Sequence, residues 1–158
     1  MEGIPAGLLP VRLLSGLSLA CLLAIAAVHA ADPLVGVWQF NPESSLPTKL
    51  LKSERLEVSS VGPGYRFVYR IVLSNGANIG YSFVSHLKGE ETKLVAADGN
   101  VFGAVRLTRR GAARFMIDVV TDAGRHEEYR VRPDGRTMTV RQTAVAGLDN
   151  LMVFDRVR

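Results

Sequence analysis

The residues of this sequence that could recognise a ligand are aromatic side chains repeated at alternate positions. Five of the eleven aromatic residues of the chain lie between positions 65 and 83. Alternate residues of a β-strand point to one face, so these rings share a face. Rings with phenol hydroxyls on an inner face suit a small apolar molecule. The predicted ligand-binding residues are these five and two later aromatic residues of the same parity: Tyr65, Phe67, Tyr69, Tyr81, Phe83, Phe115 and Tyr129.

The same rings also have a purely structural interpretation. Small β-barrels are often filled by their own inward side chains, so the aromatic face can equally form a solid core. Glu127 and Gln142 share the inward parity and face each other near one end, where they are placed to orient a polar ligand group. Because glutamate is rarely buried without a partner, the sequence favours a position in solvent for this pair.

Catalytic and metal-binding chemistry has little support in the sequence. His86 and His126 are the only histidines after residue 30, and both are expected at the surface. Two separated histidines without cysteine make a poor set of zinc ligands. No nucleophile motif accompanies them, although a catalytic triad is a spatial arrangement that spacing alone does not reveal. We therefore expect a non-catalytic protein without a metal site or a cofactor.

The elements that position these residues are short strands separated by evenly spaced turns such as Ser74-Asn75-Gly76 and Pro133-Asp134-Gly135. The pattern predicts an all-β fold, an up-and-down antiparallel meander of about 8–10 strands. Closing the meander into a barrel buries one apolar face and removes exposed edges. A sandwich would bury the same face, and the lack of any long crossover connection favours a meander over a Greek key. The strands are expected near residues 34–40, 53–61, 65–73, 77–86, 92–97, 101–109, 113–121, 125–132, 137–145 and 151–157.

Two hairpins have a register that the residues themselves predict. A three-residue turn at 74–76 pairs aromatic and branched residues of 65–73 with those of 77–86 on one face. A four-residue turn at 133–136 pairs apolar residues across the hairpin formed by 125–132 and 137–145. A slip of one residue would mix the two faces. The predicted pairs are Phe67–Phe83, Tyr69–Tyr81, Ile71–Ile79, Val131–Met138, Tyr129–Val140 and Glu128–Arg141.

Residues 1–30 have the pattern of a secretory signal peptide, with an apolar stretch that ends in Val28-His29-Ala30. Cleavage after Ala30 leaves one domain, residues 31–158, which we expect in the periplasm or outside the cell without a membrane span. The alternative is an uncleaved anchor, but the apolar run is shorter than the roughly 20 residues that a span needs. Cys21 lies in a defective lipoprotein box, so we expect no lipid on it.

Charge and cysteine usage argue against a nucleic-acid-binding protein and against a disulfide-stabilised domain. The net charge of +4 is spread along the chain rather than clustered, which argues against a nucleic-acid partner. The only cysteine lies in the leader, so residues 31–158 form no disulfide and depend on packing for stability.

Short motifs along the chain resemble those of calycins, the superfamily of lipocalins and fatty-acid-binding proteins. They are more similar to secreted bacterial domains of uncharacterised function with lipocalin-like barrels. The resemblance implies a barrel whose Trp38 lies at a closed end under Arg156, a barrel-closing structural pair. The matching segments are Gly36-Val37-Trp38, Asn41-Pro42-Glu43-Ser44-Ser45, Asp134–Val140 and Asn150–Arg156.

Two functional classes stay open from the sequence. One is a carrier that binds a small apolar ligand inside the barrel. The other is a packed barrel that binds a protein or the cell envelope through outward arginines. An interior cavity of about 300 Å³ or more favours the first class, and a filled interior favours the second. The outward arginines are Arg66, Arg70, Arg106, Arg130 and Arg132.

We predict that the exported protein begins at Ala31 and carries no lipid, because the small residues before the cut fit a signal peptidase site. Intact-mass analysis of protein purified from its own envelope checks this. A diacylglyceryl adduct on Cys21 would overturn the prediction.

Overall fold

The computed structural model of the protein describes residues 32–46, 50–120, 125–143 and 149–157. The predicted signal peptide and Cys21 lie outside this part of the chain, so both stay predictions. Among the described residues, no helix has the length and apolar character needed to cross a membrane.

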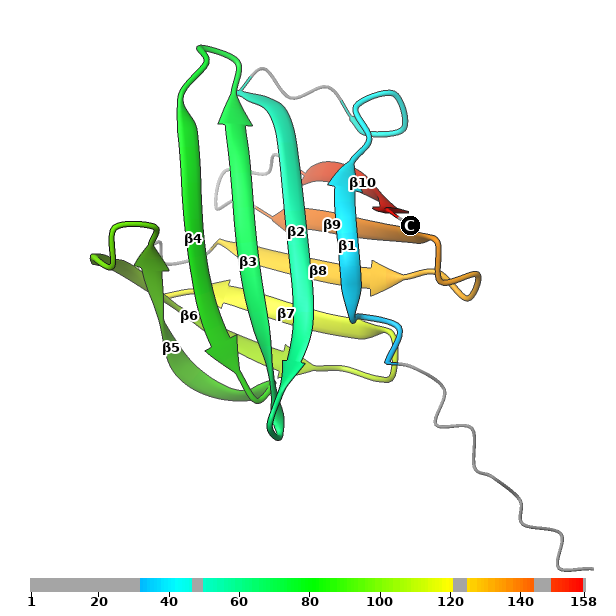
Figure 1. Ribbon diagram of the computed structural model, residues 1–158. Coiled ribbons are helices and arrows are strands. Elements are labelled where there is room, and N and C mark those ends of the chain that lie inside the picture. The colour runs from blue at the N-terminus through cyan, green and yellow to red at the C-terminus, as the bar shows by residue number, and fades with distance from the viewer. Residues whose placement is uncertain (1–31, 47–49, 121–124, 144–148, 158) are drawn as a thin grey trace, which may run out of the picture.

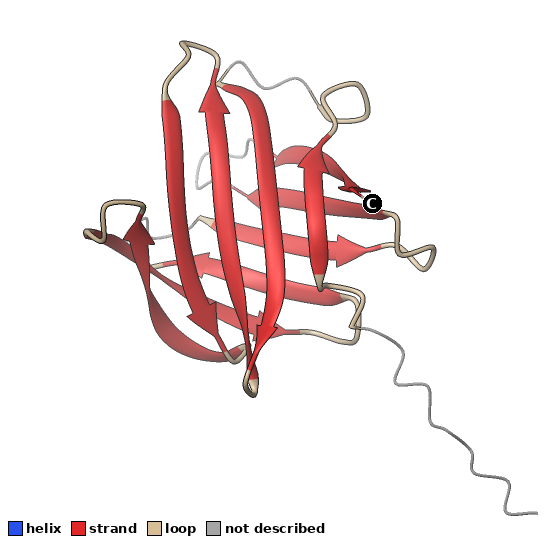
Figure 2. Cartoon of the chain, viewed as in Figure 1, coloured by secondary structure: helices blue, strands red, loops and turns tan. Residues whose placement is uncertain are grey.

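The described residues form ten antiparallel strands in one closed barrel (Figure 1; Figure 2). Each strand pairs with the next along the chain, and β1 pairs with β10 to close the ring. The predicted all-β meander and its closure are thereby confirmed. The strands are β1 (Gly36–Phe40), β2 (Leu51–Val61), β3 (Gly64–Leu73), β4 (Asn78–Ser85), β5 (Lys88–Ala96), β6 (Val101–Arg109), β7 (Arg114–Val119), β8 (His126–Val131), β9 (Thr137–Thr143) and β10 (Asp149–Val157).

The predicted register of both hairpins is confirmed. In the β3–β4 hairpin, Phe67 pairs with Phe83 and Tyr69 pairs with Tyr81. The rings of Tyr69 and Tyr81 stack with their centroids 4.6 Å apart. The β8–β9 hairpin has the expected apolar pairs as well. Matching large side chains on one face therefore fixes both registers.

The start of β5 differs from the sequence-based expectation. The strands expected near 77–86 and 92–97 leave residues 87–91 to a connection, but β5 already begins at Lys88. The chain reverses direction earlier, at Leu87. This residue has a φ of 58° and donates its backbone N–H to Ser85 Oγ at 3.1 Å. The Leu87 side chain is buried, which stabilises this uncommon conformation. Gly89 then lies where the β5–β6 register shifts, as at a bulge.

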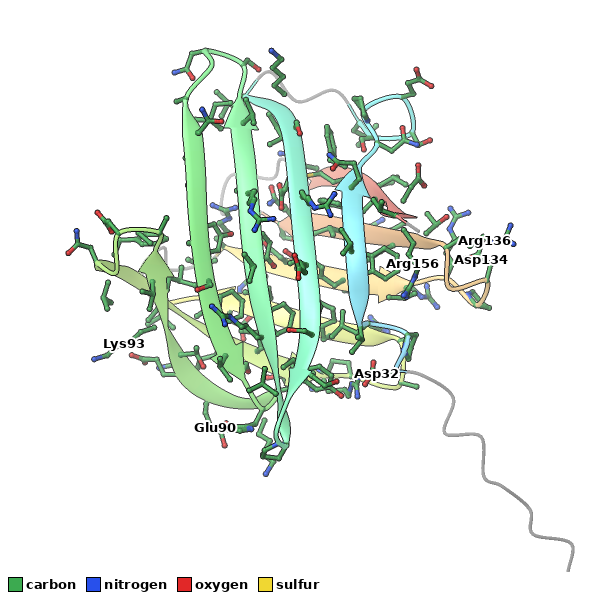
Figure 3. All side chains as sticks on the ribbon, in the orientation of Figure 1. Asp32, Glu90, Lys93, Asp134, Arg136 and Arg156 are labelled. Carbon is green, nitrogen blue, oxygen red and sulfur yellow. The ribbon has the colours of Figure 1, made fainter. Side chains whose placement is uncertain are left out.

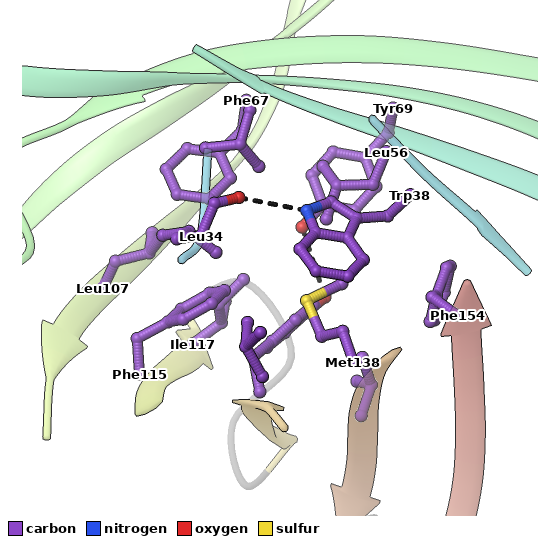
Figure 4. Close-up of a cluster of buried hydrophobic side chains, with 14 of the residues drawn as sticks. Leu34, Trp38, Leu56, Phe67, Tyr69, Leu107, Phe115, Ile117, Met138 and Phe154 are labelled. Atoms are coloured by element: carbon purple, nitrogen blue, oxygen red, sulfur yellow. Dashed lines mark hydrogen bonds between the residues drawn. The ribbon is translucent and has the colours of Figure 1, made fainter. Parts of the chain in front are cut away.

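The interior is solidly packed at one end of the barrel, which we call the closed end. This is the end where β1 and β3 begin, whereas the β3–β4 turn lies at the opposite, open end (Figure 1). Figure 4 shows Trp38 in the middle of the packed side chains. Its ring is fully buried, and its Nε1–H donates to the carbonyl oxygen of Leu34 at 3.0 Å. The least exposed neighbours are Leu34, Leu56, Phe67, Leu107, Phe115, Met138 and Phe154.

Arg156 of β10 covers Trp38, with its guanidinium carbon 4.3 Å from the ring centroid. The guanidinium also donates to the carbonyl oxygens of Pro33, Val35 and Gly135, at 2.5, 2.7 and 2.6 Å. In Figure 3, Arg156 lies beside the β8–β9 turn that contains Asp134. One side chain therefore joins the segment before β1, the last strand and the β8–β9 turn.

Gly36 leaves the space that this arrangement needs. A Cβ atom at this position would lie 2.5 Å from Arg156 Nη1, and the φ of Gly36 is +152°. Glycine adopts such a φ without the steric penalty of other residues. The Gly36-Val37-Trp38 motif thus supplies both the ring and the gap through which Arg156 reaches it.

A second contact holds the segment before β1 at the closed end. Asp32, which lies near the start of β1 in Figure 3, accepts hydrogen bonds from the Tyr65 hydroxyl at 2.5 Å and from Arg109 at 2.8 and 2.9 Å. Arg109 also lies over the Tyr65 ring, 5.4 Å from its centroid. Hydrogen bonds from Tyr65 and Leu34, together with Arg109, lower the pKa of Asp32 although its partial burial opposes this. The carboxylate thus ties β3 and β6 to the entering chain.

We expect Trp38→Ala to lower the free energy of unfolding by about 3–5 kcal/mol, because it leaves a large cavity in the closed end. Arg156→Ala should cost about 2–3 kcal/mol, since the lost hydrogen bonds from a charged group add to the roughly 1 kcal/mol of a cation–π contact. Urea unfolding measures both. Unchanged midpoints would contradict the role given to this pair.

Candidate ligand-binding site

The open half of the barrel contains a cavity of about 300 Å³. Its walls come from β3 to β8, and most of the lining side chains are apolar or aromatic. A cavity of this size and composition is typical of a small-molecule site. The lining residues are Tyr69, Ile71, Ile79, Tyr81, Phe83, Leu94, Phe102, Val105, Ile117, Val119, Arg125 and Glu127.

A second hollow of about 480 Å³ adjoins the first and forms the mouth of the barrel. The two share Ile71, Ile79 and Arg125 as lining residues, so they are neighbouring parts of one space. The remaining residues of the mouth come from the β1–β2 connection, β2, β3, β9 and β10. They are Leu46, Leu50, Leu51, Glu54, Leu73, Gln142, Asn150 and Met152.

Glu127 is the centre of a hydrogen-bond network at the wall of the cavity. It is 7% exposed, and its Oε1 accepts hydrogen bonds from Arg125 at 2.8 Å and from Gln142 at 2.9 Å. Its Oε2 accepts from the Tyr129 hydroxyl at 2.7 Å. These donors compensate the burial of the charge. The expected position in solvent was therefore wrong for Glu127, because the sequence did not reveal its partners, whereas Gln142 is half-buried at the mouth.

Two buried tyrosines extend this network into the barrel. The hydroxyls of Tyr69 and Tyr129 lie 3.2 Å apart, so they hydrogen-bond to each other. Burial raises the pKa of both phenols, and it does the same for Tyr81. The three phenols are neutral at physiological pH and offer hydroxyl groups rather than charge.

Glu54 of β2 is the second carboxyl group of this region. It is also 7% exposed, and burial raises its pKa to about 8. The negative charge of Glu127 adds to this rise, whereas the positive charge of Arg125 opposes it. Glu54 is therefore largely protonated at neutral pH. The other carboxyl group, that of Glu127, accepts hydrogen bonds from its neighbours.

The predicted ligand-binding residues lie at different heights in the barrel. Tyr69, Tyr81 and Phe83 line the cavity. The other four do not line it. Phe67 and Phe115 belong to the packed closed end, where their ring centroids are 5.9 Å apart.

Tyr129 is buried behind Glu127, and Tyr65 bonds Asp32 at the closed end. The reason for this spread is that strand parity gives the direction of a side chain but not its height along the barrel axis.

Sequence reasoning missed several residues of the site, of which Glu54, Arg125 and Asn150 are the polar ones. A signal existed for Glu54, because it alternates with Leu56 and Val58, which are both buried. An acidic residue in phase with buried apolar residues points inward. For Arg125, whose side chain is 45% exposed at the start of β8, the sequence held no comparable signal.

The two histidines lie away from this site. His86 is exposed, and His126 pairs on the surface with Asp118 at 2.6 Å. Within the described ranges, no group of three or more His, Cys, Asp or Glu residues could hold a metal ion.

Comparisons with known proteins identify the fold but no family. No protein-family model and no curated protein sequence matches the chain. Among solved structures, a Schistosoma mansoni fatty acid binding protein in complex with arachidonic acid is similar, with a TM-score of 0.57 and 11% identity over 80% of this chain and 98% of that one. A zebrafish ileal bile acid-binding protein complexed with cholic acid gives a TM-score of 0.51 and 13% identity over 79% and 99%. These similarities concern the fold, a closed barrel of ten antiparallel strands.

We expect Glu54 to make the protein less stable as pH rises. Its pKa is about 8 in the folded state and near 4.5 in the unfolded chain, so the folded state holds the extra proton between these values. A state that holds more protons loses stability as pH increases. Glu54→Gln should therefore be more stable than the parent, by a margin that grows by about 1.4 kcal/mol per pH unit between about pH 5 and about pH 8.

Urea unfolding across this pH range measures that margin. Glu57→Gln is the matched control, because Glu57 lies on the same strand with 44% of its side chain exposed. If the difference in unfolding free energy between Glu54→Gln and the parent stays constant with pH, burial does not hold the Glu54 carboxyl group neutral.

Proposed function

We propose that this protein binds a small apolar molecule in the open half of its barrel. The observation that carries the proposal is the division of the interior. Side chains fill the closed end around Trp38, whereas Tyr69, Tyr81 and their neighbours surround a cavity at the open end. A barrel that served only as a rigid surface would gain stability by filling this space, because unfilled apolar volume costs folding free energy.

The mouth supports the same proposal. Several large apolar residues that line the mouth or the adjoining cavity are exposed to solvent: Leu46 at 51%, Leu50 at 76%, Ile79 at 42% and Phe102 at 53%. Exposed apolar patches at the entrance of a hollow are typical of ligand entry. The two similar structures are complexes with arachidonic acid and cholic acid, which supports the proposal of a largely apolar ligand.

A surface-binding role through the outward arginines has weaker support. Arg106 pairs with Glu91 at 2.8 Å and Arg70 lies 3.9 Å from Glu57, so carboxylates on the same outer face offset part of the positive charge. A partly neutralised surface attracts an anionic partner less strongly than a free basic cluster does. We further propose that binding takes place in the periplasm or outside the cell, on the basis of the leader sequence.

Titration with the neutral fluorescent probe N-phenyl-1-naphthylamine tests the proposal. We expect a dissociation constant of about 1 μM, equivalent to about 8 kcal/mol. Val119→Trp places a larger side chain into the cavity wall and should weaken binding about tenfold or more. The half-buried position of Val119 near the end of β7 limits the cost to folding.

Val84→Trp is the matched control, because it is the same substitution at a position on the outer face of β4. It should leave the affinity unchanged. Urea unfolding confirms that both variants are folded. Absence of probe binding to folded parent protein, or equal loss in the two variants, would contradict a site inside the barrel.

A further inference from the structure

Glu54 carries a carboxyl group that the protein itself does not pair. The residue is 7% exposed and lines the mouth of the barrel. Within the described part of the chain, the structure gives its carboxyl group no hydrogen-bond donor, whereas its backbone oxygen accepts from Gln39 Nε2 at 3.0 Å. Among the described residues, the one fully buried polar side-chain atom without a partner is Arg109 Nε, so the Glu54 carboxyl oxygens still reach the open hollow. A ligand in the hollow can therefore supply the donor that the protein does not.

Glu127 shows by contrast how the same chain satisfies a buried carboxylate. Its two oxygens receive hydrogen bonds from Arg125, Gln142 and Tyr129. Glu54 and Glu127 influence each other electrostatically across the open half of the barrel. The site therefore contains one carboxyl group that is fully engaged and one that faces the hollow with its acceptors free.

The balance of charge in the hollow determines which ligand fits. Arg125 is the only cationic side chain among the described residues that line the cavity and the mouth, and Glu127 already binds it. Two carboxyl groups against one engaged guanidinium leave no free cation to receive an anionic head group. A carboxylate ligand would lie beside Glu54 and Glu127, where like charges repel.

We propose that the barrel selects apolar molecules that end in an amine, and that the ammonium group binds Glu54 at the mouth. The apolar part of such a molecule lies against Ile71, Ile79 and Tyr81, which line the adjoining cavity. A charged donor on a carboxylate gives a stronger hydrogen bond than a neutral one. This inference rests on the proposed function, since it specifies the ligand of the same cavity.

Binding of an ammonium group should release a proton. The empty site holds Glu54 largely protonated, because its pKa is about 8. An ammonium group favours the carboxylate form, so the proton leaves Glu54 and passes to the buffer. The other charged or titratable groups that face Glu54 are Glu127, Arg125 and the phenols of Tyr69, Tyr81 and Tyr129. The phenols are neutral, and Arg125 stays charged, so Glu54 is the source of the proton.

Calorimetric titration of the intact domain with decylammonium, 1-decanol and decanoate tests the inference. At neutral pH we expect decylammonium to bind about tenfold more tightly than decanoate. Titration in buffers of different ionisation enthalpy should show release of about one proton with the amine and none with the alcohol. Glu54→Gln should weaken decylammonium about tenfold, abolish the proton release and leave decanol binding unchanged.

Glu57→Gln controls for the substitution itself and should leave all three ligands and the proton release unaffected. If decanol binds the parent but decanoate binds as tightly as decylammonium, the inference fails while the proposed function stands. It also fails if Glu54→Gln leaves amine binding and proton release as they were. If none of the three ligands binds the folded parent, the proposed function and the inference fail together.

Discussion

The fold depends on the contact between Arg156 and Trp38. Ring closure brings β10 beside β1, and the register of that pair places Arg156 opposite Trp38. The guanidinium covers the indole and binds three carbonyl oxygens from two separate segments. Arginine suits this role, because its planar fork stacks on a ring and donates several hydrogen bonds at once. A lysine could not replace these contacts.

This closed end makes the open end possible. The packed rings around Trp38 exclude water from half of the interior and supply much of the apolar burial on which a cysteine-free domain relies. The other half then tolerates features that cost stability, namely an unfilled cavity, a buried carboxyl group at Glu54 and buried phenols. Sites that bind ligands commonly retain such costs, which the ligand offsets on binding. The division of the barrel thus separates the part that maintains the fold from the part that we propose binds.

The alternation of apolar and polar residues predicted the fold well, because neighbouring residues in a strand already show which side chains face the core. Alternation and turn residues set the strands, and matched aromatic pairs such as Tyr69–Tyr81 set the register. The Gly36-Val37-Trp38 motif indicated the Arg156 contact. The start of β5 was mispredicted because the chain reverses at Leu87, and leucine is rarely found with positive φ.

The site was less predictable, because it depends on where side chains meet across the barrel. Phe67 and Phe83 are paired neighbours, yet only Phe83 lines the cavity. The burial of Glu127 depends on donors from β9 and from Arg125. The pKa of Glu54 is raised first by burial inside the closed barrel and then by the charge of Glu127 in a distant strand. These relations follow from the closed three-dimensional arrangement and leave no mark in local spacing.

Methyl NMR tests the central claim, binding inside the open half of the barrel, most directly. The three isoleucines after the leader, Ile71, Ile79 and Ile117, all line the cavity, whereas Met138 lies in the packed closed end. With isoleucine and methionine methyl groups labelled, we expect bound N-phenyl-1-naphthylamine to give intermolecular NOEs to the three isoleucine methyls and none to Met138. NOEs confined to the outward Met116, with the isoleucine methyls unaffected, would contradict the account.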